Sequence, residues 1–87
     1  MEEATYEECA RYSKAYPFPE GAQYLAGERY PTIPWWQDDG ASHLQYGHKG
    51  TWHRGVSRTE YLPYMKYIPL EFIIDQFLEK EKRNVRN

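Results

Sequence analysis

The sequence predicts a mainly α-helical fold with an irregular middle, and three observations lead to this prediction. Each end of the chain carries the start and stop signals of a helix. The segment 17–55 between them holds most of the six prolines and all six glycines. The chain has 87 residues, too few for a second domain. We therefore expect a single small domain over residues 1–87, in which two end helices flank a segment rich in proline, glycine and aromatic residues.

The N-terminal helix is expected at about residues 5–16. Thr5 followed by Glu8 is a capping-box pattern, in which the two side chains bond each other's backbone amides. Acidic residues dominate the start of this segment and basic residues lie near its end, as the helix dipole favours. Pro17 should end the helix, because the residue before a proline is disfavoured in the α conformation.

The middle of the chain is predicted to be mostly irregular. Tyr-Pro-Phe-Pro at 16–19 and Tyr-Pro-Thr-Ile-Pro at 30–34 favour extended, polyproline-like backbone. Between them, residues 21–26 could form a short helix that stops at Gly27. Residues 41–54 admit a β-hairpin, although two short strands alone are only marginally stable in water.

The segment 57–67 shows a pattern with a shorter period. Ser57 and Glu60 repeat the capping-box spacing, but Pro63 limits any helix there to a short or 3₁₀ piece. Tyrosines then recur at every third position, namely Tyr61, Tyr64 and Tyr67. This period fits 3₁₀ or polyproline geometry, which would line the three rings along one edge.

The C-terminal amphipathic helix, at about residues 69–83, is the clearest pattern in the chain. Pro69 suits the first position of a helix, and basic residues gather in the last turns. Apolar residues recur at helical spacing at Leu70, Ile73, Ile74, Phe77 and Leu78. We predict that Leu70, Ile73, Ile74 and Phe77 of this stripe anchor the core.

Aromatic residues make up 17% of the chain, with nine Tyr, three Trp and three Phe. A domain of this size cannot bury all of them, and exposed Trp and Tyr are typical of binding surfaces. The alternative is that the tyrosines simply cover a thin core. The residues predicted to bind a protein partner are Trp35, Trp36, Trp52, Tyr30, Tyr61, Tyr64 and Tyr67.

Trp35 and Trp36 are the predicted centre of this binding surface. Neighbouring residues of an extended segment point in opposite directions, so we expect one indole to enter the domain and the other to face outward. The pair is followed by an Asp-Asp-Gly turn signal at 38–40, a context typical of a surface segment.

Charge and cysteine content exclude several classes of protein. The net charge of −2 provides no field for nucleic acid or anionic membranes, so we expect no direct nucleic-acid contact. Cys9 is the single cysteine, which excludes an internal disulfide and fits a reducing compartment. No apolar run reaches the length of a membrane span, and the acidic start differs from a secretory or organellar presequence. We expect an intracellular protein, cytoplasmic or mitochondrial.

Three histidines raise the question of a metal site. His43, His48 and His53 recur every five residues close to Asp38 and Asp39, and imidazole with carboxylate can ligate zinc or iron. The register of the hairpin decides whether His43 and His53 share a face, and the sequence leaves that open. Solvated or hydrogen-bonded histidines are the alternative that we favour, so the prediction is no metal and no other cofactor.

Catalysis is not expected, because the chain has neither a nucleophile elbow nor a phosphate-binding loop in its required strand-to-helix context. We therefore expect a non-catalytic protein-interaction protein without a small-molecule substrate. The favoured form is a small accessory or structural subunit that drapes over a larger intracellular assembly, such as a mitochondrial respiratory or ATP-synthase complex. The alternative is a free-standing inhibitor of the phage anti-defence type, which blocks a host enzyme or nucleoprotein complex.

Overall fold

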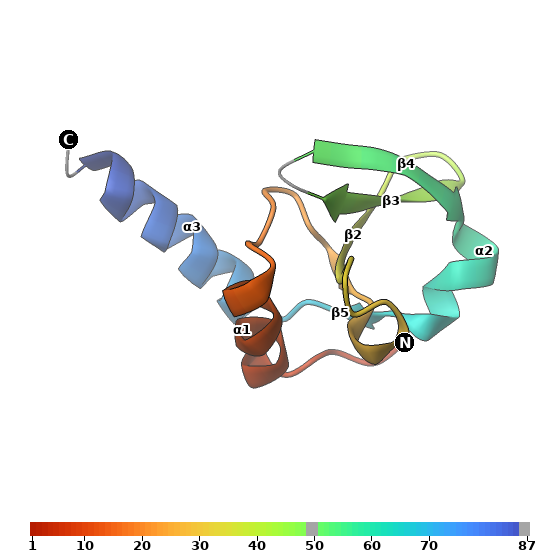
Figure 1. Ribbon diagram of the computed structural model, residues 1–87, viewed down its shortest axis with the longest axis horizontal. Coiled ribbons are helices and arrows are strands. Elements are labelled where there is room, and N and C mark those ends of the chain that lie inside the picture. The colour runs from red at the N-terminus through yellow and green to blue at the C-terminus, as the bar shows by residue number, and fades with distance from the viewer. Residues whose placement is uncertain (49–50, 86–87) are drawn as a thin grey trace.

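The structure is a computed structural model that describes residues 1–48 and 51–85, with side chains except at positions 48, 54 and 80–85. Its described part folds as a β-sheet with helices on both sides (Figure 1). In chain order the elements are α1 (Tyr6–Ala15), β1 (Tyr24–Leu25), the 3₁₀ turn η1 (Gly27–Arg29), β2 (Trp35–Asp38), β3 (His43–His48), β4 (Thr51–Ser57), α2 (Arg58–Tyr61), η2 (Leu62–Tyr64), β5 (Lys66–Tyr67) and α3 (Leu70–Val85).

The five strands form one sheet in the order β4-β3-β2-β1-β5, in which every neighbouring pair is antiparallel. The short strand β1 holds the sheet together, because Tyr24 pairs with Trp36 on one side and with Tyr67 on the other. Beyond β5, the N-terminal segment continues the sheet by an isolated parallel bridge between Glu3 and Tyr67. The backbone amide of Ala4 donates to the Tyr67 carbonyl at 2.8 Å.

The prediction of a mainly helical fold with an irregular middle is wrong. The middle segment supplies β1, β2, β3 and most of β4, and residues 24–25 are a strand where a short helix was expected. The prolines at 19, 31 and 34 lie in the connections, so they delimit the strands without interrupting them. The hairpin is stable here because it is the outer part of a sheet with three further strands.

The two end helices and the hairpin are confirmed as elements. At the start of α1, the Glu8 amide donates to Thr5 Oγ1 at 3.1 Å and the Thr5 amide donates to Glu8 Oε1 at 3.2 Å, which is the predicted capping box. In the hairpin, His48 pairs with Thr51, and residues 49–50 lie outside the described part. A short helix and a 3₁₀ turn follow at 58–64, as expected, but Ser57 makes no side-chain cap and Tyr67 lies in strand β5.

Both faces of the sheet are covered, and each has its own core. On the α1 side the buried residues are Ala4, Cys9, Ala22, Leu25, Trp35, Ile68 and Phe72. On the α2 side they are Tyr24, Ala26, Trp36, Leu44 and Met65. Side chains alternate between the faces of a strand, so Tyr24 and Leu25 of β1 belong to different cores.

Helix α3 packs against α1 only near its start and then runs away from the sheet (Figure 1). The hydroxyl of Tyr6 on α1 donates a hydrogen bond to the Asp75 carboxylate on α3, and the Tyr6 ring meets Phe72 edge-on at 5.3 Å. The projecting helix gives the molecule its elongated shape, with extents of 43 × 24 × 21 Å. None of the helices in the described ranges is both long and apolar enough to cross a bilayer.

Candidate functional site

Helix α3 exposes a row of large apolar side chains on the side that faces away from the core. Leu70 is 68% exposed, Ile74 47%, Phe77 59% and Leu78 50%, and we call these four residues the α3 apolar face. Phe72, which is 1% exposed, enters the core in their place, while Ile73 is half-buried beside it. The prediction that Leu70, Ile74 and Phe77 anchor the core is therefore wrong, whereas Ile73 does pack against it.

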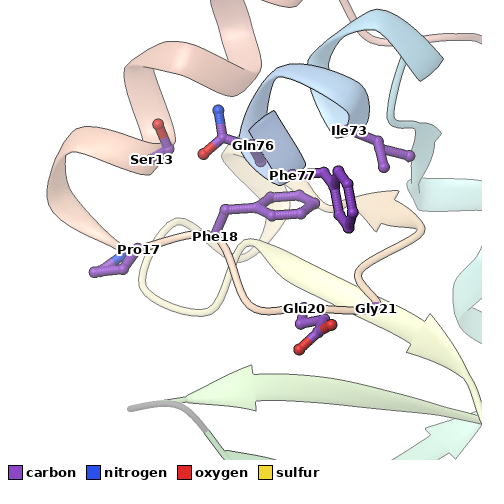
Figure 2. A pocket seen from close by; sticks show the side chains of 8 residues that line it. All are labelled: Ser13, Pro17, Phe18, Glu20, Gly21, Ile73, Gln76 and Phe77. Atoms are coloured by element: carbon purple, nitrogen blue, oxygen red, sulfur yellow. The ribbon is translucent and has the colours of Figure 1, made fainter. Parts of the chain in front are cut away.

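A groove of about 660 Å³ adjoins the α3 apolar face and shares Phe77 with it. It lies between α3, the end of α1 and the connection that follows α1, and Figure 2 shows the rings of Phe18 and Phe77 turned toward each other inside it. The lining residues are Ser13, Pro17, Phe18, Glu20, Gly21, Ile73, Gln76 and Phe77.

Core contacts hold the floor of the groove in place. The Phe18 ring meets Trp35 edge-on at 4.9 Å and Phe72 edge-on at 5.4 Å. The backbone on either side of Phe18 is tied to the sheet, because Trp35 Nε1 donates to the Tyr16 carbonyl at 2.8 Å and Trp52 Nε1 donates to the Glu20 carbonyl at 3.3 Å. The groove is therefore a preformed feature of the fold.

Trp35 and Trp36 are both buried, at 1% and 2% exposure, so the prediction that one of them faces outward is wrong. Their opposite orientation along β2 is as expected, but each face of the sheet is covered and each indole lies in a core. Trp36 Nε1 donates to the Ile33 carbonyl at 2.7 Å, so both indole donors are satisfied inside the protein.

The four tyrosines of the predicted binding set differ in how far they are exposed. Tyr30 and Tyr61 are half-buried and pack around Trp36, with centroids 5.5 Å apart for Tyr30–Trp36 and 6.2 Å apart for Tyr30–Tyr61. Tyr64 and Tyr67 are about half exposed. The Tyr64 ring carries the Arg29 guanidinium at 4.1 Å from its centroid, and the Tyr67 ring lies beside Tyr24. Whether these residues bind a partner stays a prediction.

The histidines whose side chains are described are placed apart. His53 pairs with Tyr46 across the hairpin and stacks on its ring at 5.3 Å, whereas His43 pairs with Ser57 and lies 3.9 Å from Asp39 Oδ2. The side chain of His48 lies outside the described part. Among the described residues, no group of three or more His, Cys, Asp or Glu side chains could hold a metal ion.

Among the side chains that the structure describes, two ion pairs link elements that are distant in the sequence. Arg58 Nη1 lies 2.5 Å from Asp38 Oδ2, and this hydrogen bond lowers the pKa of Asp38 below its ordinary value. Lys66 Nζ lies 3.2 Å from Glu8 Oε2. Burial by itself would raise the pKa of Glu8, but its hydrogen bonds with the Thr5 backbone and Lys66 give a net lowering. These pairs fix β2 to α2 and α1 to β5.

The thiol of Cys9 is fully buried in the core on the α1 side. Burial, with a smaller contribution from the Glu8 charge, raises its pKa to about 12. A nucleophilic cysteine needs a thiolate and access to solvent, and Cys9 has neither. It acts as a small packing residue.

Comparisons of this chain with family models, curated proteins and solved structures gave no match. The assignment of a candidate site to the α3 apolar face and the groove therefore rests on their geometry alone.

The sequence does carry a signal for the α3 apolar face, since the apolar residues of 70–78 lie around most of the helix circumference once Phe72 is counted. A helix that is apolar on two sides is suited to contacts on both.

Proposed function

We propose that the protein is a non-catalytic protein-interaction domain that binds its partner through the α3 apolar face and the adjoining groove. One observation carries the proposal: Leu70, Ile74, Phe77 and Leu78, each about half exposed or more, occupy successive turns of one projecting helix. Exposed apolar side chains that occur singly need no explanation, but a contiguous set marks an interaction site.

The groove supports the same proposal through its chemistry. Its floor is aromatic and held by the core, and polar groups of Ser13, Gln76 and Glu20 lie along its lining. Preformed apolar pockets of this kind receive one large anchor side chain, while surrounding contacts exclude water. The face and the groove together suit a partner helix that lies along α3 and inserts one side chain beside Phe77.

Two forms of this function remain as proposals, both in an intracellular setting. The accessory subunit was expected to drape an irregular middle over a larger assembly, but the middle forms a sheet with two cores. That fold favours a domain that is already folded before it binds, as either a docked subunit or a free-standing inhibitor. A sharp, cooperative thermal transition of the purified chain would agree with this, and a broad one would favour folding on the partner.

The test compares affinity purification of the tagged wild-type chain with two variants. Ile74→Glu places a charge in the middle of the α3 apolar face, and Thr32→Glu places one at an exposed position in the connection before β2, outside the predicted binding residues. We expect Ile74→Glu to weaken partner binding by about tenfold or more, while Thr32→Glu retains it. Equal retention by all three chains, with equal melting temperatures, would contradict the proposal.

A further inference from the structure

The charge pattern of α3 points to the kind of partner that its apolar face fits. Residues 70–79 carry three acidic side chains, at Glu71, Asp75 and Glu79, and no basic one. In the sequence, the next positions carry Lys80, Lys82 and Arg83, with Glu81 as the only acid. The helix dipole favours this order, but its effect fades beyond the first and last turns, and Asp75 and Glu79 lie further in.

We propose that the α3 apolar face is the interface between two copies of this chain, which pair through antiparallel α3 helices. This inference rests on the proposed function, in which the face binds protein, and names the partner as a second copy. Antiparallel pairing places the Glu71 end of each helix beside the basic end of the other, at both ends of the contact, while Asp75 is held against α1 by the Tyr6 hydroxyl. Parallel pairing would place like charges together.

Helical geometry gives the pairing a definite register. Positions 71 and 82 are eleven residues apart, about three turns, so they lie on the same flank of α3. A twofold axis across the two helices brings this flank against its equivalent, so that Glu71 of one copy faces position 82 of the other. Ile74, Phe77 and Leu78 then lie in the middle of the contact, where they cover their counterparts.

The shape of the molecule leaves room for this arrangement. Helix α3 has 16 residues, about 24 Å, and its later turns project from the body beyond α1 (Figure 1). In an antiparallel pair the two sheets lie at opposite ends of the paired helices. Four large apolar side chains from each copy form a small interface, so we expect a dimer that dissociates on dilution.

The first experiment measures the mass of the full chain by sedimentation equilibrium from about 1 to about 200 µM, a range that spans weak dimers. We expect a concentration-dependent dimer for wild type and for the control Thr32→Glu. Ile74→Glu and Leu78→Glu should each be monomeric throughout, with circular dichroism and melting as checks on folding. A dimer that survives both α3 variants overturns the inference.

The second experiment exchanges charges across the proposed contact. In a homodimer of either single variant, Glu71→Lys or Lys82→Glu, like charges lie opposite one another at both ends of the contact. Each variant should therefore dimerise roughly tenfold more weakly than wild type. A mixture of the two variants restores both attractions in a heterodimer, so the mixed sample should dimerise as well as wild type. If the mixture stays as weak as its components, the antiparallel register is wrong and the inference fails.

Rejection of the dimer and rejection of the proposed function are distinguished by different results. If the wild-type chain is monomeric at every concentration, the second copy is not the partner. In that case a different protein that is retained by wild type and lost with Ile74→Glu leaves the proposed function in place. If the chain is monomeric and no protein depends on Ile74, both proposals are rejected.

Discussion

Trp35 and Trp36 are adjacent in β2, yet each lies in a different core on opposite faces of the sheet. The Trp35 ring stacks on Phe72 with centroids 6.1 Å apart, and the Trp36 ring contacts Tyr46 at 5.3 Å. A strand of four residues thereby joins the packing of α1 and α3 to the packing of α2.

We expect Trp35→Ala and Trp36→Ala each to lower the free energy of unfolding by ~3–5 kcal/mol, because each removes a large side chain from a packed core. Urea unfolding followed by circular dichroism measures the change. Trp52→Ala, at a half-buried position, should cost less. A variant of Trp35 or Trp36 that kept wild-type stability would contradict the two-core structure.

Phe72 and Phe77 form a matched pair on α3, because they are the same residue type five positions apart but only Phe72 is buried. Phe72→Ala should cost ~3–5 kcal/mol of stability, whereas Phe77→Ala should cost less than about 1 kcal/mol. Phe77→Ala should instead weaken partner binding, since its ring lines the groove. Chemical denaturation and a binding assay on both variants decide this, and a larger stability loss for Phe77→Ala would reverse the assignment.

The end helices were predictable from the sequence because their signals are local. Thr5 and Glu8 are three residues apart, and Pro69 immediately precedes α3. The sheet was not predictable in this way, because β1 has only two residues and depends on pairing with residues distant in the chain. No local pattern in Tyr24 and Leu25 specifies those partners.

The exposed face of α3 could not be predicted from the sequence either, because contacts with distant segments decide which side of the helix is buried. Helical spacing identified Leu70, Ile74 and Phe77 as one face, but spacing does not say which apolar face of a helix meets the core. Phe72 decides it, since its ring fits between Tyr6 of α1, Phe18 of the connection after α1 and Trp35 of β2. That three-dimensional fit is absent from the periodicity of α3 itself.

Gly55 is required by a close approach between β4 and β3. A Cβ atom at position 55 would lie 0.7 Å from the Leu44 carbonyl oxygen, next to an irregularity in the strand pairing. Gly55→Ala must therefore displace backbone and disrupt the hairpin. Gly27→Ala is the control, because φ there is +59° but the space is open, so it should cost only about 1 kcal/mol. Thermal melting should show the larger loss for Gly55→Ala, and equal losses would contradict the close approach.

The ion pair between Asp38 and Arg58 should make stability depend on pH on the acid side. The folded-state pKa of Asp38 is lowered from its ordinary value of 3.8, chiefly by the hydrogen bond from Arg58. The stability it contributes is present above that ordinary value and is lost as the pH falls through the lower folded value. Asp38→Asn should thus be less stable than wild type at neutral pH, and the difference should shrink below about pH 3. Urea titrations across this range test it, and a difference independent of pH would contradict the ion-pair explanation.

Cys9 should report on the opening of the core and on stability at alkaline pH. Its buried thiol has a pKa raised from 9.0 to about 12, so the stability from keeping the thiol neutral is present below pH 9 and is lost as the pH rises toward 12. At mildly alkaline pH the native chain should resist thiol reagents, and labelling should follow unfolding in urea. Cys9→Ala removes this titration, so it should lose less stability than wild type between pH 9 and about pH 11. Wild type and Cys9→Ala keep the same tyrosines, which also ionise in that range, so the comparison isolates the thiol. Rapid labelling of the folded chain, or equal alkaline losses in the two proteins, would mean that Cys9 is not sealed in the core.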